Sequence, residues 1–254
     1  MKKISSSFKI SLLALSASIF TLSPLQAEEK KKALSHESEA AVVIQGGNSE
    51  TQTYSVKQKT VYTMKPSEFT LTGGYLLGRA KVLPNGDLEK NAENWNAALR
   101  YDYYVNDRFS IWAQHGWEGD KFAGYHTRTN NDIGGKYYLW KKDKNAYFFT
   151  ELGYRYTLEN PLVGDDVDSH YVRAYAEASH QYSEAITFKL WVEALPDMTD
   201  TENFVLNFEP SLYVTLNKYF SLKTAFLGKY DTVPAVTGAE KFDYTYTLSL
   251  VAKY

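Results

Sequence analysis

Apolar and polar residues alternate along the last stretch of the chain, residues 242–254. The apolar or aromatic positions are Phe242, Tyr244, Tyr246, Leu248, Leu250, Ala252 and Tyr254. A period of two places one face of a strand against apolar surroundings and the other against water. The alternation outlasts the roughly 5–6 residues of a typical soluble strand and covers the roughly ten that a tilted strand needs to cross a bilayer. The stretch therefore predicts a membrane-spanning β-strand.

The same pattern recurs along the chain and predicts twelve strands. Their expected ranges are 39–46, 51–64, 67–79, 94–105, 108–117, 129–140, 146–158, 170–182, 185–194, 203–216, 219–230 and 241–254. The connections alternate between short turns and segments of about eight to thirteen residues, except for a tight first loop at 47–50. An even strand count with short turns at one end and longer loops at the other is typical of outer-membrane barrels. The predicted fold is a single antiparallel transmembrane β-barrel with periplasmic turns and external loops, occupying residues 39–254. In strand two the register is uncertain, because Gln58 and Thr60 interrupt its apolar face.

The first 27 residues have the composition of a cleaved secretory signal peptide. Three lysines, Lys2, Lys3 and Lys9, precede an apolar run that is too short for a transmembrane helix. Leu25, Gln26 and Ala27 form a small-residue cleavage site. Residues 28–38 are charged and aperiodic, which predicts an exposed periplasmic tail. An exported chain destined for the outer membrane of a Gram-negative bacterium is the resulting expectation.

Composition narrows the class of protein further. Aromatic residues make up 15% of the chain, including 21 Tyr, and barrels gather such residues in girdles at the membrane interfaces. The chain has no Cys, so its stability does not come from disulfides. The full-chain charge of −2, less the three leader lysines, leaves −5. This mild and mixed charge does not indicate a nucleic-acid partner.

Charged residues gather on the predicted inner face of the barrel. The expected lumen-lining residues are Lys57, Lys59, Arg100, Asp102, Lys136, Glu151, Arg155, Arg173, Glu177, Lys189, Glu193, Glu209, Lys223, Lys229 and Asp243. Rings of charged side chains set ion selectivity in channels, so one interpretation is a water-filled pore with a slight anion preference. The alternative is that opposite charges pair across the lumen and close it, since twelve strands lie between filled barrels and wide porins.

The predicted external loops are rich in carboxylates. Among these, Asp165, Asp166 and Asp168 are candidates for a hard divalent cation, which prefers oxygen ligands. Their spacing matches no EF-hand loop, and solvated loop charge is the simpler explanation. No cofactor is expected, because the paired glycines at 46–47 and 73–74 lie in or beside strands and no helix follows them.

A hydrolase is the least favoured alternative. A Ser-His triad needs its three members within reach of one another. His36, His126 and His170 fall in the predicted tail, a loop and a strand start, and neither His115 nor His180 lies in the His-x-Ser-Asn-Gly pattern of the outer-membrane phospholipase. The sequence therefore predicts no catalytic residues.

Three segments carry a resemblance to a known family: EAAVVIQGGNSETQTYSV, ENWNAALRYDYYVNDRFSIWAQHGWEGD and NNDIGGKYYLW. Over residues 38–254 the chain resembles the salt-stress-induced outer-membrane proteins of the YdiY-like family. The resemblance implies a Gram-negative outer-membrane barrel with a link to osmotic stress, and it brings no catalytic residues. The terminal strand also resembles the assembly signal of outer-membrane barrels, carried here by Tyr246, Leu248, Leu250, Ala252 and Tyr254.

The leading functional expectation is a non-enzymatic outer-membrane barrel that passes ions or small solutes. The runner-up is a closed structural or surface-interaction barrel whose acidic loops bind cations or lipopolysaccharide. Expected partners are outer-membrane lipid, lipopolysaccharide and the barrel-assembly machinery.

Overall fold

The structure is a computed structural model that describes residues 33–45, 50–82, 87–234, 238 and 240–254. The predicted signal peptide and residues 28–32 of the predicted tail lie outside the described residues. So do residues 47–49 of the tight first loop and parts of two other predicted loops, at 83–86 and at 235–237 and 239.

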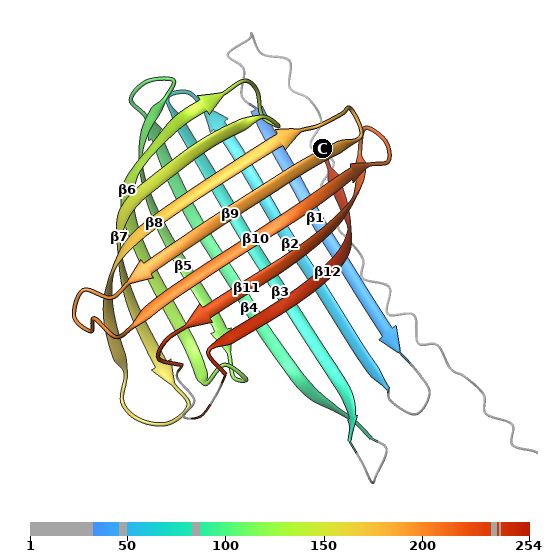
Figure 1. The fold of residues 1–254 in the computed structure, drawn as a ribbon, viewed down its shortest axis with the longest axis vertical. Coiled ribbons are helices and arrows are strands. Elements are labelled where there is room, and N and C mark those ends of the chain that lie inside the picture. The colour runs from blue at the N-terminus through green and yellow to red at the C-terminus, as the bar shows by residue number, and fades with distance from the viewer. Residues whose placement is uncertain (1–32, 46–49, 83–86, 235–237, 239) are drawn as a thin grey trace, which may run out of the picture. The chain divides into compact units, whose positions relative to one another are not determined.

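Twelve antiparallel strands form one closed barrel in which each strand pairs with its neighbours in the sequence and β12 returns to β1 (Figure 1). The strands are β1 (Ala33–Gln45), β2 (Thr51–Met64), β3 (Ser67–Val82), β4 (Asp87–Tyr104), β5 (Phe109–Asp120), β6 (Tyr125–Lys141), β7 (Tyr147–Pro161), β8 (Val167–Gln181), β9 (Ile186–Pro196), β10 (Phe204–Thr215), β11 (Phe220–Asp231) and β12 (Phe242–Lys253). The predicted antiparallel barrel of twelve strands is confirmed. We call the end that carries the β2–β3 connection and Tyr254 the turn end, and the opposite end the loop end.

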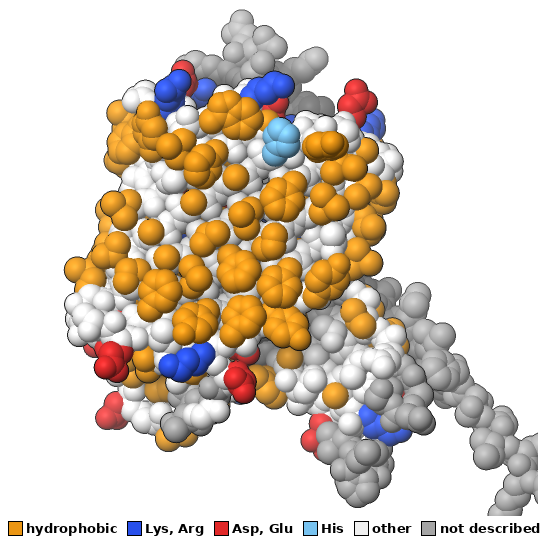
Figure 2. Space-filling view, viewed as in Figure 1, with side chains coloured by type: hydrophobic (Ala, Val, Ile, Leu, Met, Phe, Trp, Pro, Cys, Tyr) orange, Lys and Arg blue, Asp and Glu red, His pale blue; other side chains and the backbone are white. Residues whose placement is uncertain are grey.

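Side chains alternate between the inside and the outside of the barrel along each strand. On β12, Ser249 and Val251 point inward and are 2% and 0% exposed, whereas Tyr246 and Leu248 point outward and are 69% and 57% exposed. Hydrophobic side chains cover the visible outer face, and charged side chains gather near its two rims (Figure 2). In the described part of the chain, no helix is long and apolar enough to cross a membrane.

The strands extend further than the apolar pattern predicts. β1 begins at Ala33, which pairs with Thr63, so residues 33–38 of the predicted tail belong to the first strand. β3 continues to Val82 and β4 starts at Asp87, which leaves only 83–86 of the loop predicted at 81–93. A backbone ladder requires no apolar side chains, and polar residues such as Glu89 and Lys90 continue it beyond the alternating segment.

The uncertain register of strand two is resolved by its partners. Lys57 and Lys59 pair with Glu39 and Glu37 of β1, and Lys57 points inward like Glu39. Gln58 therefore points outward with Ser38, which donates a hydrogen bond to it at 2.5 Å. Thr60 on the same face bonds His36 Nδ1 at 2.9 Å. A small polar patch thus occupies the outer face of β1 and β2, where each member has a partner.

Candidate functional site in the barrel lumen

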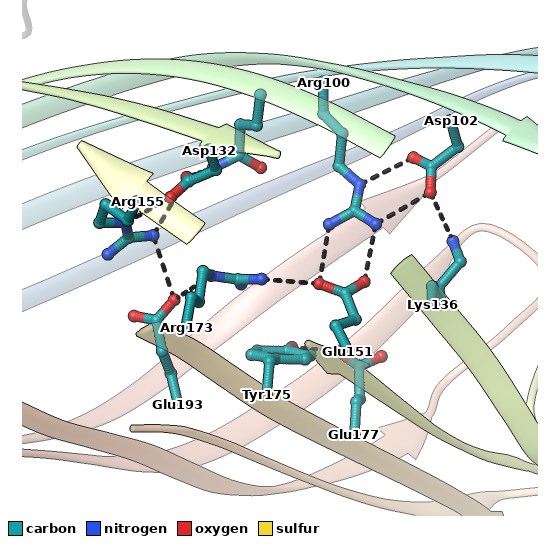
Figure 3. Close-up of polar contacts among 11 residues, drawn as sticks. Arg100, Asp102, Asp132, Lys136, Glu151, Arg155, Arg173, Tyr175, Glu177 and Glu193 are labelled. Atoms are coloured by element: carbon teal, nitrogen blue, oxygen red, sulfur yellow. Dashed lines mark hydrogen bonds and ion pairs between the residues drawn. The ribbon is translucent and has the colours of Figure 1, made fainter. Parts of the chain in front are cut away.

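Eight charged side chains in the lumen form one continuous network between β4 and β9 (Figure 3). In order of contact they are Lys136, Asp102, Arg100, Glu151, Arg173, Glu193, Arg155 and Asp132. We refer to this set as the charge network. Period-two alternation brings them together, because each lies on the inward face of its strand.

Arg100 and Glu151 form the longest reach within the charge network. Arg100 on β4 donates from Nη1 and Nη2 to the two carboxylate oxygens of Glu151 on β7, at 3.1 and 2.7 Å. Its Nε also donates to Asp102 Oδ2 at 2.7 Å. Because β5 and β6 separate β4 from β7 in the wall, this guanidinium extends over two strands inside the lumen. Such paired, charge-assisted contacts are strong and directional.

Arg173 continues the charge network toward β9. It donates from Nη1 to Glu151 and from Nε to Glu193, at 2.7 and 2.6 Å. Arg155 joins the same Glu193 oxygen to Asp132, at 3.2 and 2.6 Å. The charge network contains four cations and four anions, so it is neutral as a whole. Its charges are satisfied by one another, as buried ions must be.

The ring of Trp112 on β5 packs against two guanidinium groups of the charge network. Arg100 and Arg173 lie over its ring, at 4.4 and 5.0 Å from the centroid, and such cation–π contacts add to the ion pairs. The ring fits because Gly134 and Gly153 lie under it: a Cβ at either position would come within 2.8 or 3.2 Å of Trp112 Cζ2. The glycines therefore allow a large aromatic ring to lie against the barrel wall.

A second charged group lies between β8 and β9. Lys189 forms an ion pair with Glu177 at 2.9 Å, and Glu177 also accepts hydrogen bonds from Tyr147 and Tyr175 at 2.5 and 2.6 Å. Lys59 on β2 interacts electrostatically with both charged residues. Charged side chains on β2 and on β8 and β9 therefore interact across the lumen.

A third charged group lies where β1 meets β12. Lys223 on β11 contacts Glu39 on β1 at 3.1 Å and Glu209 on β10 at 3.0 Å. Ser249 on β12 donates to Glu39 Oε1 at 2.9 Å. Side chains from four strands therefore meet at this junction.

Open space remains on the other side of the lumen, along β1 to β4. A cavity of about 190 Å³ is lined by Glu37, Glu39, Lys57, Gln58, Lys59, Thr72, Gly73 and Asn96. The side chain of Lys57 is 42% exposed and lies 3.9 Å from Glu39, and Lys59 is also exposed. These lysines are far less constrained than the cations of the charge network.

The structure brings together most of the predicted lumen-lining residues, in the three groups above. Lys57 and Lys59 line the cavity instead. Lys229 and Asp243 lie opposite each other in register at the loop end, both exposed, and form no ion pair within the described residues. Sequence reasoning missed Asp132, Trp112 and the tyrosines that bind Glu177. Asp132 shares the inward alternation of Lys136 on the same strand, which is the signal that identifies it.

The other predicted residues are separated. Asp166 accepts a hydrogen bond from Asn160 at 2.7 Å, and Asp168 lies 3.4 Å from His170. The described residues contain no cluster of three or more His, Cys, Asp or Glu that could hold a metal. The histidines with hydrogen-bonded rings contact Thr60, Asn131 and Tyr154, and no His–Ser hydrogen bond occurs in the described part of the chain. Four of the predicted assembly-signal residues lie on the outward face of β12, and Tyr254 directly follows the strand.

A family model described as "Protein of unknown function, DUF481" matches residues 38–254 of the sequence. The chain belongs to this family. It is also 26% identical over 234 residues to the "Uncharacterized protein YdiY" of Escherichia coli (strain K12), covering 92% of this chain and 88% of that protein. The resemblance to YdiY-like proteins is therefore confirmed.

Solved structures with a similar fold include the COG4313 outer membrane channel from Pseudomonas putida F1, which is 8% identical with a TM-score of 0.49 and coverage of 90% of this chain and 100% of that one. The NanC porin is 11% identical with a TM-score of 0.47 and coverage of 87% and 98%. The strand pairing of the DUF481 chain itself closes the barrel.

Proposed function

We propose that this DUF481 protein is an outer-membrane barrel whose lumen passes small ions, with a preference for anions. The belt of outward apolar side chains between charged rims supports a membrane position (Figure 2). The turn end then faces the periplasm and the loop end faces the exterior.

The observation that supports ion passage is that the lumen has two different sides, one with fully paired charges and one with an open cavity. The charge network is neutral and fixed, so it contributes structure and little selectivity. Lys57 and Lys59 instead face the cavity along β1 to β4. The two carboxylates beside them also form other ion pairs, Glu37 with Lys253 and Glu39 with Lys223, which Glu209 shares. Partly free cations in a narrow aqueous path favour anions.

Single-channel recording of the refolded barrel in a planar bilayer tests this function. We expect discrete conductance steps and a reversal potential in a KCl gradient that reports preference for chloride. The double substitution of Lys57→Glu and Lys59→Glu should shift the preference toward potassium. Lys229→Glu, a single charge reversal at the exposed loop end, is the control for each single substitution of Lys57→Glu and Lys59→Glu and should change selectivity little. Unchanged selectivity in the double variant would show that ions do not pass these lysines.

A closed structural barrel is the second candidate. The reach of Arg100 from β4 to Glu151 on β7 favours it, because this contact fills part of the lumen. Folded protein that inserts but never conducts would support the closed barrel. The acidic loop end and its cation or lipopolysaccharide partners would then be the place to seek function, and an osmotic-stress role, implied by the family resemblance, would act through the envelope.

A further inference from the structure

The pairing between β1 and β12 covers a small part of both strands. Four residue pairs join the two strands, from Glu37 with Lys253 to Ala40 with Leu250, and His36 with Tyr254 adds one more just beyond the end of β12. By contrast, β1 is paired with β2 from Ala33 through Gln45, and β12 with β11 as far as Phe242. We call this junction the seam. Toward the loop end of the seam, residues 41–45 and 242–249 are not paired with each other, and Figure 1 shows the two strands diverging there.

The turn end of the seam is held firmly. His36 and Tyr254 exchange two backbone hydrogen bonds, at 2.7 and 3.1 Å, and Lys253 forms an ion pair with Glu37 at 3.3 Å. Inside the barrel, Glu39 joins β1 to β11 and β12 through Lys223 and Ser249. These contacts end at the level where the pairing ends. The seam is therefore fixed by contacts at its turn end and unpaired toward its loop end.

Beside the unpaired part, the outward side chains are apolar, and the inward side chains nearest the end of the pairing are small. Val42 and Ile44 on β1 are 60% and 68% exposed, and Tyr244 and Tyr246 on β12 are 68% and 69% exposed. The inward positions at the same level include Ala41 and Thr247. At this level no long side chain obstructs the passage from the lumen to the seam, whereas Val43 and Gln45 occupy the next inward positions of β1.

Unpaired strand edges are not stable against hydrocarbon, because each free backbone N–H or C=O group needs a partner. Water that reaches the edges from the lumen supplies such partners. The cavity that contains Lys57 and Lys59 begins directly behind β1, since Lys57 pairs with Glu39. Glu37 and Glu39 also line this cavity, but together with the side chains that contact them, Lys223, Lys253 and Glu209, the group has four cations and three anions. A cavity with an excess of positive charge thus lies next to an opening whose outer margin is apolar.

From this arrangement, which rests on the proposed membrane position, we propose that the unpaired part of the seam is a lateral opening for a single-chain amphiphile with an anionic head. The head lies in the cavity against Lys57 and Lys59. The alkyl chain emerges between Val42 and Leu248 into the outer leaflet. The molecule passes between the lumen and the bilayer without crossing the hydrocarbon with its charge exposed.

Engineered disulfides test the opening. Because the sequence has no native Cys, any disulfide comes from the introduced pair. Continuing the seam register places Val42 opposite Leu248. The pair of Val42→Cys and Leu248→Cys should therefore resist oxidation in outer-membrane preparations, because a disulfide needs Cα atoms within about 7 Å. The control pair, Ser38→Cys and Ala252→Cys, lies at paired positions and should oxidise readily. Equal oxidation of both pairs would show a closed seam and overturn the proposal.

A photoreactive dodecanoate with a diazirine beside its carboxylate tests the ligand, using the full barrel in nanodiscs. Labelling should reach the lumenal face of β2 near Lys57, whereas the alcohol with the same chain should label only the outer belt. Ala41→Trp should abolish the lumenal labelling by filling the opening from inside, and Ala40→Trp, which points outward, should preserve it. The double variant of Lys57→Gln and Lys59→Gln should also lose it. Lumenal labelling that is equal for both head groups, or unchanged by Ala41→Trp, would overturn the proposal.

Conductance separates this proposal from the proposed ion passage. Ala41→Trp blocks the lateral opening but leaves the axis of the lumen free, so its chloride conductance should persist. A barrel that conducts but takes no label would lack the lateral opening and retain the pore. A silent barrel that takes the label would lack the pore and retain the opening.

Discussion

The two sides of the lumen are built from the same residue types but differ in how those residues are connected. Between β4 and β9, ion pairs link eight charges into a neutral network over Trp112. Along β1 to β3 and at the seam, charges form a smaller group around Glu39, and the pairing of β1 with β12 is short. Charge content alone does not determine rigidity. In the proposed function, the first side contributes stability and the second side is the path of the ions.

The largest expected difference between the two sides is in stability. Glu151→Gln should destabilise the barrel by about 3–5 kcal/mol, because Arg100 and Arg173 both lose a buried anion. Lys59→Gln on the open side should have little effect. Urea unfolding of both variants, followed by the heat-dependent shift of the folded band in gels, measures the difference. Equal midpoints would mean that the charge network does not stabilise the barrel.

The second largest expected difference is in the cost of placing an arginine on the outer surface. Leu152→Arg, near the middle of the fully paired β7, should cost about 2–4 kcal/mol if the residue meets hydrocarbon. Leu248→Arg on β12 should cost less, because the unpaired edge gives its guanidinium access to water in the lumen. Refolding yields into lipid vesicles, with Thr245→Arg as an inward-facing control on β12, measure the cost. A larger cost at Leu248 than at Leu152 would contradict the open seam.

The contacts of Glu39 at the turn end of the seam should affect stability locally. Glu39→Gln weakens the contacts with Lys223 and Ser249, and a charged hydrogen bond of this kind contributes about 1.5–3 kcal/mol. Hydrogen exchange should increase in β1 and β12 while β6 and β7 keep their protection. Uniform faster exchange around the barrel would indicate that the seam is not an independent region.

The smallest expected effect lies outside the strands, in the β9–β10 loop at residues 197–203. Burial of Asp197 opposes its charged form, but hydrogen bonds from Thr199, Asp200 and Asn203 outweigh it and lower the pKa below its ordinary 3.8. A lowered pKa contributes loop stability above pH 3.8, and this stability is lost as pH falls through the folded value. Proteolysis of the loop by pepsin should increase over that range. In Asp197→Asn the acid-dependent increase should be absent.

The sequence by itself determined the barrel. A period-two pattern repeated along the chain specifies strands with one apolar face, and closure is the arrangement that leaves few backbone groups unpaired in a membrane. The pattern also selected the inward charges, because alternation fixes which residues share a face. It underestimated strand length at the loop end, since backbone pairing continues through polar residues such as Glu89.

Only the tertiary structure decided which charges meet. Arg100 and Glu151 are 51 positions apart in sequence. Their contact depends on how the strands are staggered in the barrel and on the space that Gly134 and Gly153 leave for the ring of Trp112. The seam was equally hidden, because the alternation of β1 and β12 says which way each side chain points but not how far the two strands pair. Pairing length depends on how the first and last strands meet when the barrel closes, and that is a property of all twelve strands together.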